Sequence, residues 1–209
     1  MDKQPIDLAQ FAAKITETEG FPDHACAFTG HRPQKFPWGF NESDPACVAL
    51  RDTLAAQIAA LVDAGYTDFL TGMALGVDQW AAQTVLALRK KSRGLFGLGK
   101  KNAPRLHCFL PCEGQDAKWS QASKELYRSI LGQADSVVYV SRRYDDQCML
   151  RRNRALVDHA ALILAVYDGE YRGGTAATVR YAREQGRELI VIDPVTRAVS
   201  RESKKEAVQ

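Results

Sequence analysis

The sequence lacks the features that mark membrane, secreted and fibrous proteins. No apolar run in its 209 residues reaches the roughly 18–20 residues that a membrane-spanning helix needs. The first 20 residues carry Asp2, Asp7, Glu17 and Glu19 and no apolar core, which is unlike a secretory signal. A composition of 45% hydrophobic and 25% charged residues excludes a disordered chain or a collagen-like repeat. We therefore expect a cytoplasmic protein with a buried core and no membrane contact.

Cysteine and charge give no strong signal either. Five cysteines are an odd number without the spacing of a disulfide framework, so free thiols are expected. Cys108 and Cys112 lie four positions apart beside His107, which is not the Cys-x-x-Cys spacing of a zinc site, so buried thiols are expected and no intrinsic metal is predicted. The net charge is only +3, although residues 89–105 hold seven basic residues and no acidic one. Because that cluster has almost no aromatic residue on which a base could stack, it is interpreted as a solvated surface, and nucleic acid is not the expected partner.

Strand and helix patterns alternate along the chain. The strand patterns occupy residues 25–29, 66–71, 105–110, 136–140, 161–167 and 189–192, and the helical patterns occupy residues 45–64, 76–91, 121–132, 148–159 and 175–185. The continuously apolar run at 161–167 is typical of a parallel strand that is buried on both faces. This alternation predicts a single α/β domain with a mostly parallel sheet and helices on both faces.

The ends of the chain have a different composition. We expect the domain to span residues 25–194, after an N-terminal extension over residues 1–24 and before a polar C-terminal tail over residues 195–209, frayed from residue 197 onward. Residues 94–103 are expected to form a surface insertion.

Ligands of an open parallel sheet bind beyond the carboxyl ends of its strands, so the loops that follow the strands are the first candidates for a site. Three of them combine glycine with threonine where a helix begins, and they are Thr29-Gly30, Thr71-Gly72 and Gly173-Gly174-Thr175. Glycine lets a backbone approach an anion, and a helix N-terminus supplies free N–H groups and a partial positive charge. One such loop alone would be a turn or a helix cap. Three at one edge predict a phosphate-binding crevice.

Charged residues near these loops extend the candidate site. Arg32 and Arg152 are expected to contact an anion, although Arg152 could instead pair on the surface with Asp145 or Asp146. Asp78 could complement its helix dipole, accept a ribose hydroxyl or act as an acid or base.

The candidate site residues follow from these loops and charges. Trp38 and Trp119 lie in loops at the same edge and could stack on a base or cover the core. Asp78 is the candidate catalytic residue. The candidate ligand-binding residues are Thr29, Gly30, His31, Arg32, Gly72, Gly76, Asp78, Arg152, Asn153, Gly173, Gly174 and Thr175.

Five motifs follow one another along the chain, and they are Thr29-Gly30-His31-Arg32-Pro33, Gly72-x-Ala74-x-Gly76-Val77-Asp78-x-Trp80-Ala81-Ala82, Lys118-Trp119, Arg152-Asn153-Arg154 and Gly173-Gly174-Thr175. Taken in order, these motifs resemble the YpsA-like branch of the SLOG superfamily, which groups Rossmann-like proteins related to the DNA-processing protein DprA and the LOG cytokinin-activating enzymes. The resemblance covers residues 25–194. It implies a Rossmann-like sheet that binds a nucleotide or nucleotide-derived ligand, as a sensor or a processing module.

One departure bears on activity. LOG enzymes release a base from a nucleoside monophosphate, and their signature resembles Pro-Gly-Gly-x-Gly-Thr followed three residues on by a catalytic Glu. Here Arg172 replaces the Pro, the x-Gly step is missing, and Thr178 stands where the Glu would fall. Hydrolysis of a nucleotide N-glycosidic or phosphate bond therefore remains the alternative to a binding module, and DprA-like binding of single-stranded DNA is a weaker third hypothesis.

The sequence patterns identify neither a cofactor nor an oligomeric state. Magnesium would have to arrive with the phosphate, since no cluster of metal ligands is visible. The alanine-rich segment at residues 55–64 could pack against a second copy in a homodimer.

Overall fold

The computed structural model describes residues 6–11, 23–93 and 103–203. The expected insertion at residues 94–103 lies outside these ranges except for residue 103. In chain order the elements are β1 (Ile6–Asp7), β2 (Ala25–Gly30), η1 (Pro33–Lys35), α2 (Pro45–Asp63), β3 (Asp68–Thr71), α3 (Val77–Arg93), β4 (Arg105–Leu110), α4 (Gln121–Gln133), β5 (Ser136–Tyr139), α5 (Cys148–Asp158), β6 (Leu162–Val166), α6 (Gly174–Glu184), β7 (Glu188–Ile192) and β8 (Val199–Glu202). Every predicted strand and helix is present, with ends within two residues of the prediction.

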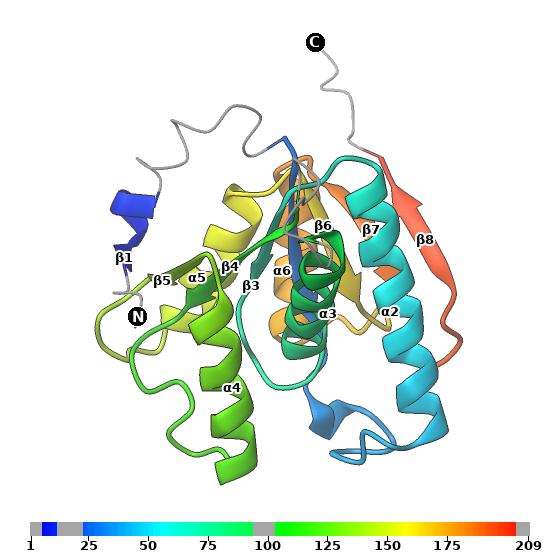
Figure 1. Ribbon diagram of the computed structural model, residues 1–209, viewed down its shortest axis with the longest axis horizontal. Coiled ribbons are helices and arrows are strands. Elements are labelled where there is room, and N and C mark those ends of the chain that lie inside the picture. The colour runs from blue at the N-terminus through cyan, green and yellow to red at the C-terminus, as the bar shows by residue number, and fades with distance from the viewer. Residues whose placement is uncertain (1–5, 12–22, 94–102, 204–209) are drawn as a thin grey trace.

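A single eight-stranded sheet runs through the molecule in the order β1-β5-β4-β3-β2-β6-β7-β8 (Figure 1). All neighbouring pairs are parallel except β7 and β8. From β2 the chain builds outward on one side through β3, β4 and β5, and then crosses to place β6 on the other side of β2. The carboxyl ends of β2 and β6 therefore flank a topological switch point, which is where open α/β sheets bind ligands.

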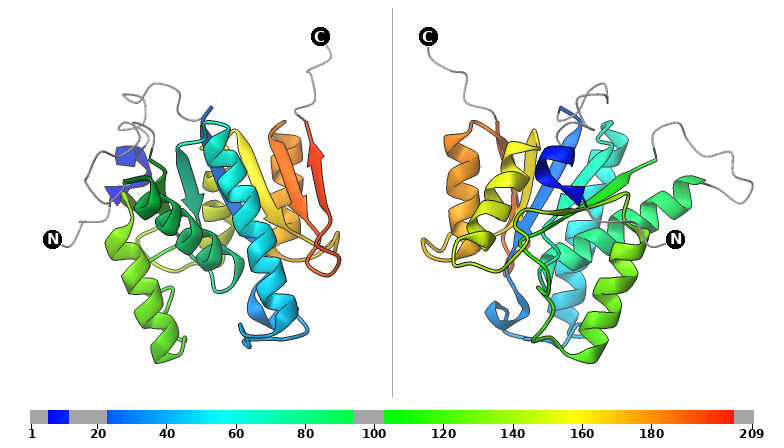
Figure 2. Two further views of the ribbon diagram at one scale, coloured as in Figure 1. Left: turned by 45° about the vertical axis from the view of Figure 1, so that its right-hand side comes forward. Right: turned by 90° about the vertical axis from the view of Figure 1, so that its left-hand side faces the viewer.

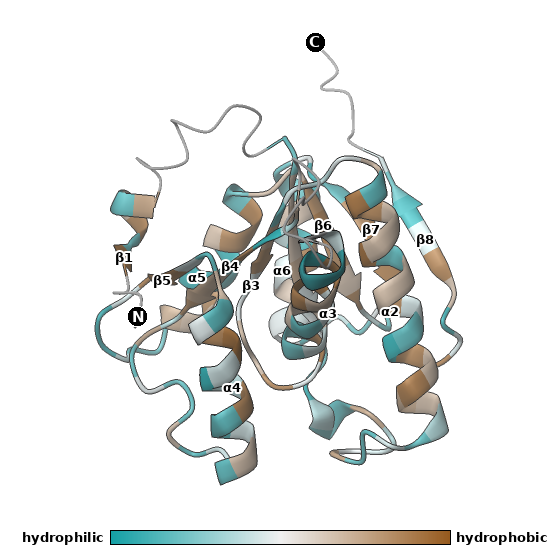
Figure 3. Ribbon diagram, in the orientation of Figure 1, coloured by the Kyte–Doolittle hydropathy of each residue, from teal (hydrophilic) through white to brown (hydrophobic). Residues whose placement is uncertain are grey.

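Helices cover both faces of the sheet, as predicted (Figure 2). The face with α2, α3 and α4 packs on one set of strand side chains, which includes Cys26 and Phe28. The alternate residues Ala25 and Ala27 belong to the other core layer, under α5 and α6. The central strands are apolar while the helices mix apolar and polar residues, so apolar burial on both sheet faces holds the layers together (Figure 3).

Helix α2 is long and apolar enough to pass a length-and-composition test for a membrane span, with a mean hydropathy of 1.3 over its best window. The apolar side chains on one face of α2 pack on the sheet. Leu50, Leu54, Ile58 and Leu61 are all buried in the layer that covers the sheet. Only 28% of that window is buried, so α2 covers the sheet with one apolar face and leaves the rest of its surface outside the core.

Both ends of the described chain add strands that the sequence patterns did not predict. In the N-terminal extension, β1 pairs with β5, and Phe11 is buried with its ring centroid 5.0 Å from that of Phe109. The expectation that residues 197–209 fray is wrong for β8, which pairs antiparallel with β7. Arg183 anchors β8 by donating from Nε and Nη2 to Glu202, at 2.8 and 2.7 Å. An edge strand with exposed polar side chains carries no apolar alternation, so pattern reasoning could not detect it.

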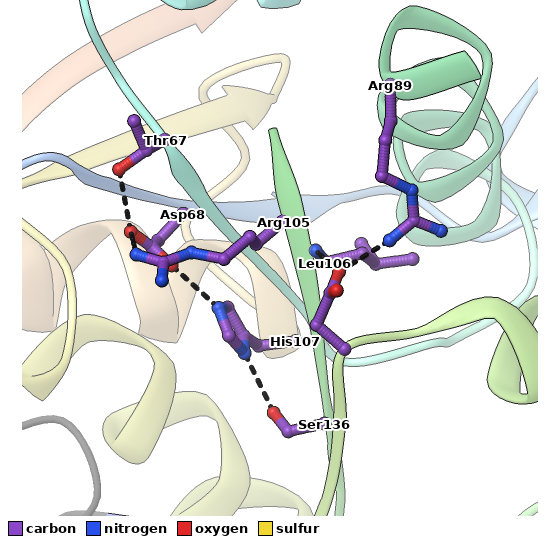
Figure 4. A network of polar contacts seen from close by, with 8 residues as sticks. Thr67, Asp68, Arg89, Arg105, Leu106, His107 and Ser136 are labelled. Atoms are coloured by element: carbon purple, nitrogen blue, oxygen red, sulfur yellow. Dashed lines mark hydrogen bonds and ion pairs between the residues drawn. The ribbon is translucent and has the colours of Figure 1, made fainter. Parts of the chain in front are cut away.

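A polar network joins β3, β4 and β5 at their amino ends, away from the switch point (Figure 4). Asp68 lies 2.8 Å from His107 Nε2 and accepts a hydrogen bond of 2.7 Å from Arg105, while His107 Nδ1 lies 2.8 Å from Ser136 Oγ. Burial opposes ionisation of Asp68, but these hydrogen bonds prevail and hold its pKa below the ordinary aspartate value. The network fixes the register of three strands at the edge opposite the candidate site.

Candidate functional site

A cavity of about 470 Å³ lies at the carboxyl ends of β2 and β6, at the switch point. Its walls come from the end of β2 and the loop after it, the start of α3 and the turn before it, one side of α5, the loop after β6 and the N-terminus of α6. Ten of the twelve predicted ligand-binding residues line it, and they are Thr29, Gly30, His31, Arg32, Asp78, Arg152, Asn153, Gly173, Gly174 and Thr175. Residues that are far apart in sequence thus meet in one crevice, which we call the phosphate cavity after the ligand that the sequence led us to expect there.

The two remaining predicted residues, Gly72 and Gly76, support the cavity rather than line it. A Cβ atom at Gly72 would lie 1.3 Å from Nη1 of Arg152, so only glycine leaves room for that guanidinium. Gly76 has a φ of +87°, and a Cβ there would lie 2.9 Å from the carbonyl oxygen of His31. Both glycines allow the backbone to pack closely beneath the site.

Arg152 is the most unusual residue of the cavity. It projects from α5, its side chain is only 5% exposed, and its Nη1 lies 3.5 Å from Oδ2 of Asp78. Its Nε is buried and has no hydrogen-bond partner in the described chain. A guanidinium has five N–H donors, so a single long contact leaves it under-satisfied. The alternative that Arg152 pairs on the surface with Asp145 or Asp146 is wrong, because Arg152 is buried beside Asp78. The neighbouring Arg151 makes the ion pair with Asp145.

Asp78 faces Arg152 from the first turn of α3. Its Oδ2 also accepts a hydrogen bond of 3.2 Å from the backbone N–H of Ala74. Burial raises the pKa of Asp78 above the ordinary aspartate value, and the charges of Arg152 and Arg32 oppose that rise. The pair is therefore an incompletely compensated buried ion pair, an arrangement that costs stability unless another group completes it.

The N-terminus of α6 forms the opposite wall. Gly173 occupies the N-cap position with a φ of +104° and no side-chain cap. The first hydrogen bond of the helix runs from the N–H of Ala177 to the carbonyl of Gly173, at 3.0 Å. Within the described ranges no hydrogen bond engages the N–H groups of Gly174, Thr175 or Ala176. These free donors and the helix dipole can bind an anion.

Sequence reasoning missed seven lining residues. They are Phe28, Gln34, Lys35, Ala74, Leu156, Glu170 and Arg172. Lys35 and Glu170, which both line the cavity, form an ion pair although 135 positions separate them, and no local pattern could have signalled it. Arg172 was visible only as the departure from a Pro-Gly-Gly signature.

The charge of the lining favours an anion. Arg32, Lys35, Arg152 and Arg172 face only two carboxylates, Asp78 and Glu170. The guanidinium of Arg32 is exposed and takes part in no hydrogen bond or ion pair with the rest of the described chain.

His31 lies in the loop after β2, and its side chain is buried. Its Nε2 lies 3.2 Å from Asp168 Oδ2 but without hydrogen-bonding geometry. Its ring packs near those of Phe36 and Tyr167, with centroids 6.0 and 6.4 Å away. These contacts hold the loop after β2 against the end of β6.

A second cavity, of about 600 Å³, adjoins the first. Arg32 and Gln34 line both cavities. The other lining residues of the second cavity are Phe40, Leu75, Gln115, Lys118, Trp119, Ser120, Ser123 and Met149. The two tryptophans proposed to stack on a base therefore have different surroundings. Trp119 lines this cavity, whereas Trp38 stacks on Phe36 in the core layer, at a centroid distance of 4.8 Å.

Part of the basic cluster at residues 89–105 falls within the described chain, and residues 94–102 lie outside it. Arg89 is engaged with Asp135 at 2.6 Å and Arg105 with Asp68 at 2.7 Å, so two of the seven basic side chains serve the fold. In residues 6–11, 23–93 and 103–203, no three His, Cys, Asp or Glu side chains gather as a metal site. All five cysteines are free and buried, as the sequence predicted.

Comparison with known proteins relates this geometry to a family. A UPF0398 protein of Shouchella clausii is 32% identical over 157 residues, which cover 74% of this chain and 79% of the relative. A UPF0398 protein of Bacillus pumilus is 30% identical over 159 residues, which cover 75% and 80% of the two chains. Both relatives are bacterial.

Two solved structures share the fold. DNA processing protein A (DprA) of Streptococcus pneumoniae superimposes with a TM-score of 0.53 at 16% identity, over 82% of this chain and 53% of that one. DprA of Helicobacter pylori, described in its single-stranded DNA binding mode, gives a TM-score of 0.53 at 16% identity, over 81% and 65%. The match thus spans about half to two thirds of the DprA chains. Residues 26–195 match the model of the YspA SLOG family, so the chain belongs to that family.

Proposed function

We propose that the phosphate cavity binds the phosphate of a nucleotide or nucleotide-derived ligand, and that the protein acts as a sensor or processing module for that ligand. The observation that carries the proposal is the buried guanidinium of Arg152, whose Nε has no partner in the described chain. Leaving one N–H of a buried guanidinium without an acceptor is costly, so Arg152 favours a further acceptor such as a phosphate oxygen beside Asp78.

A phosphate matches the donors on both sides of the cavity. A guanidinium binds two phosphate oxygens in its planar fork, and the α6 N-terminus can donate from the N–H groups of Gly174 and Thr175. Membership of the YspA SLOG family is consistent with a nucleotide-related role.

Binding and hydrolysis are the two candidate outcomes for the bound ligand. Hydrolysis is favoured by one observation, the raised pKa of Asp78 in a cavity with cations, because perturbed carboxylates often serve as acids or bases. The 3.5 Å ion pair between Asp78 and Arg152 equally suits a structural counter-ion, so binding without turnover is the primary proposal. Release of free base from a nucleoside monophosphate by the wild type, and its loss in Asp78→Asn, would assign hydrolysis instead.

A thermal-shift panel tests the proposal. The panel contains nucleoside mono-, di- and triphosphates, ADP-ribose, NAD and cyclic dinucleotides, each with and without magnesium. A ligand at about 100 times its dissociation constant adds roughly 2.7 kcal/mol to the free energy of unfolding, which raises Tm by several degrees. We expect a selective shift for at least one compound. No shift from any compound would refute the proposal.

Gly174→Val is the matched perturbation on the helix side. A Cβ at Gly174 would meet only Asn153 Nδ2, at 3.8 Å, so the variant should fold while its side chain occupies the anion position. It should abolish the ligand-induced shift. Gly132→Val is the control, since a Cβ there meets nothing within 4 Å and the residue lies far from the cavity in α4.

A further inference from the structure

We infer that the second cavity binds the heteroaromatic base of the same ligand, and that this base carries an N–H donor. The inference rests on the proposed function, because the phosphate cavity must hold the phosphate. The two cavities are neighbours that share Arg32 and Gln34, so one molecule can occupy both. Volumes of about 470 and 600 Å³ are each typical of a small-molecule site.

The walls of the second cavity suit a flat ring. Trp119 and Phe40 supply aromatic surface, and Leu75 and Met149 supply aliphatic surface. Aromatic side chains are the usual platforms on which nucleic-acid bases stack. Lys118 and Arg32 are the charged residues of the lining, and no carboxylate lines this cavity, which suits an anionic ligand.

The ring of Trp119 and the loop that carries Phe40 are held in place before any ligand arrives. The ring of Trp119 packs perpendicular to that of Tyr127, with centroids 5.2 Å apart. Phe40 is 61% exposed, but its loop is fixed because Glu42 accepts a 2.8 Å hydrogen bond from Trp80 Nε1 and a 3.0 Å one from Arg51. An exposed phenyl ring on an anchored loop, beside a cavity, has no role in the core.

Gln115 adds a specific requirement for a donor. Its Nε2 donates to the carbonyl oxygens of Met73 and Gly72, at 2.9 and 3.3 Å, so the orientation of the amide is fixed. Its Oε1 is therefore the free end, and this atom is buried with no hydrogen-bond partner in the described chain. A carbonyl oxygen can only accept, so the group that satisfies it must carry an N–H or O–H.

The turn that Gln115 holds is itself constrained. Met73 adopts a left-handed φ of +57°, which is uncommon for a residue other than glycine, and its N–H donates to Thr71 Oγ1 at 3.1 Å. Strained backbone of this kind tends to occur at ligand sites. Gln115 thus connects the turn beneath Arg152 to the second cavity.

Titration calorimetry with three probes separates the two cavities. Ribose 5-phosphate tests the phosphate cavity alone, AMP adds a base with an amino group, and purine riboside 5′-monophosphate has a base of the same shape without any N–H. We expect AMP to bind about tenfold or more tightly than purine riboside 5′-monophosphate, since one unpaired acceptor distinguishes the two complexes.

Variants of the aromatic walls provide the second arm. Phe40→Ala and Trp119→Ala should each weaken AMP about tenfold and leave ribose 5-phosphate unchanged. Phe40 is largely exposed, so its variant should fold even if Trp119→Ala does not. Tyr144→Ala is the control, because Tyr144 is an exposed aromatic residue that lines neither cavity.

The outcomes separate the two claims. Ribose 5-phosphate binding with no added affinity for AMP, or with no effect of either aromatic variant, overturns the inference and leaves the proposed function intact. Failure of ribose 5-phosphate, AMP and every other compound of the thermal-shift panel to bind overturns both claims.

Discussion

Replacement of Arg152 by methionine tests the anion site at its most buried group. The variant keeps much of the apolar stem of the side chain and removes the charge. In the complex, truncating one partner of a desolvated charge pair costs about 2–5 kcal/mol, which corresponds to at least a roughly 30-fold increase in Kd. AMP affinity, measured by calorimetry, should fall by at least that factor.

The same change affects the free protein through Asp78. Without Arg152 the carboxylate loses its close cation, and breaking a buried pair costs about 3–5 kcal/mol. Because burial already raises the pKa of Asp78, the folded variant binds a proton more readily than the unfolded chain. Its stability should therefore fall as pH rises above the ordinary aspartate pKa, and recover as pH falls toward it. Denaturant unfolding at several pH values measures this.

Arg151→Met is the neighbouring control. Arg151 is 45% exposed and pairs with Asp145 on the surface, so its loss should change neither AMP affinity nor stability appreciably. Arg152→Lys retains the charge for Asp78 and loses the planar fork, and it should fold but bind AMP more weakly than the wild type. Equal AMP affinity in the wild type and both Arg152 variants would refute this reasoning.

Further predictions concern packing, acid stability and nucleic acid. Gly72→Ala should displace Arg152 and lower both stability, by about 1–3 kcal/mol, and AMP affinity, whereas Gly132→Ala should do neither; unchanged binding in Gly72→Ala would count against the placement of Arg152. Asp68→Asn should lower the free energy of unfolding at pH 7 by about 3 kcal/mol. Because the pKa of Asp68 is lowered in the fold by His107, its contribution exists above the ordinary aspartate pKa and is lost as pH falls through the folded value; an acid limb of equal steepness in Asp68→Asn would argue against this. In a mobility-shift assay at low salt, single-stranded DNA should remain unbound, and a salt-sensitive shift would restore the DNA-binding hypothesis.

The sequence predicted the fold because its core strands carry strong signals. Buried parallel strands such as residues 162–166 are continuously apolar, and the helices between them begin and end at recognisable residues. The edge strand β8 was missed since its burial depends on pairing with β7 and on the distant Arg183–Glu202 contact. Pairing across the chain leaves no local trace in the sequence.

The candidate site was predictable where it follows strand ends. The loops after β2 and β6 converge because parallel strands end at the same edge, so Arg32 and Gly174 could be placed together in advance. The burial and the hydrogen-bond partners of individual side chains could not be predicted. That Arg152 is buried while Arg151 is exposed depends on which face of α5 meets the sheet, and the free Oε1 of Gln115 depends on a turn 42 residues earlier.

The position of the phosphorus atom in a crystal structure of the full chain with AMP tests phosphate binding most directly. We expect phosphate oxygens about 3 Å from the Arg152 guanidinium and from the N–H groups of Gly174 and Thr175. A phosphate bound elsewhere, or a cavity without phosphate at a saturating AMP concentration, would contradict it.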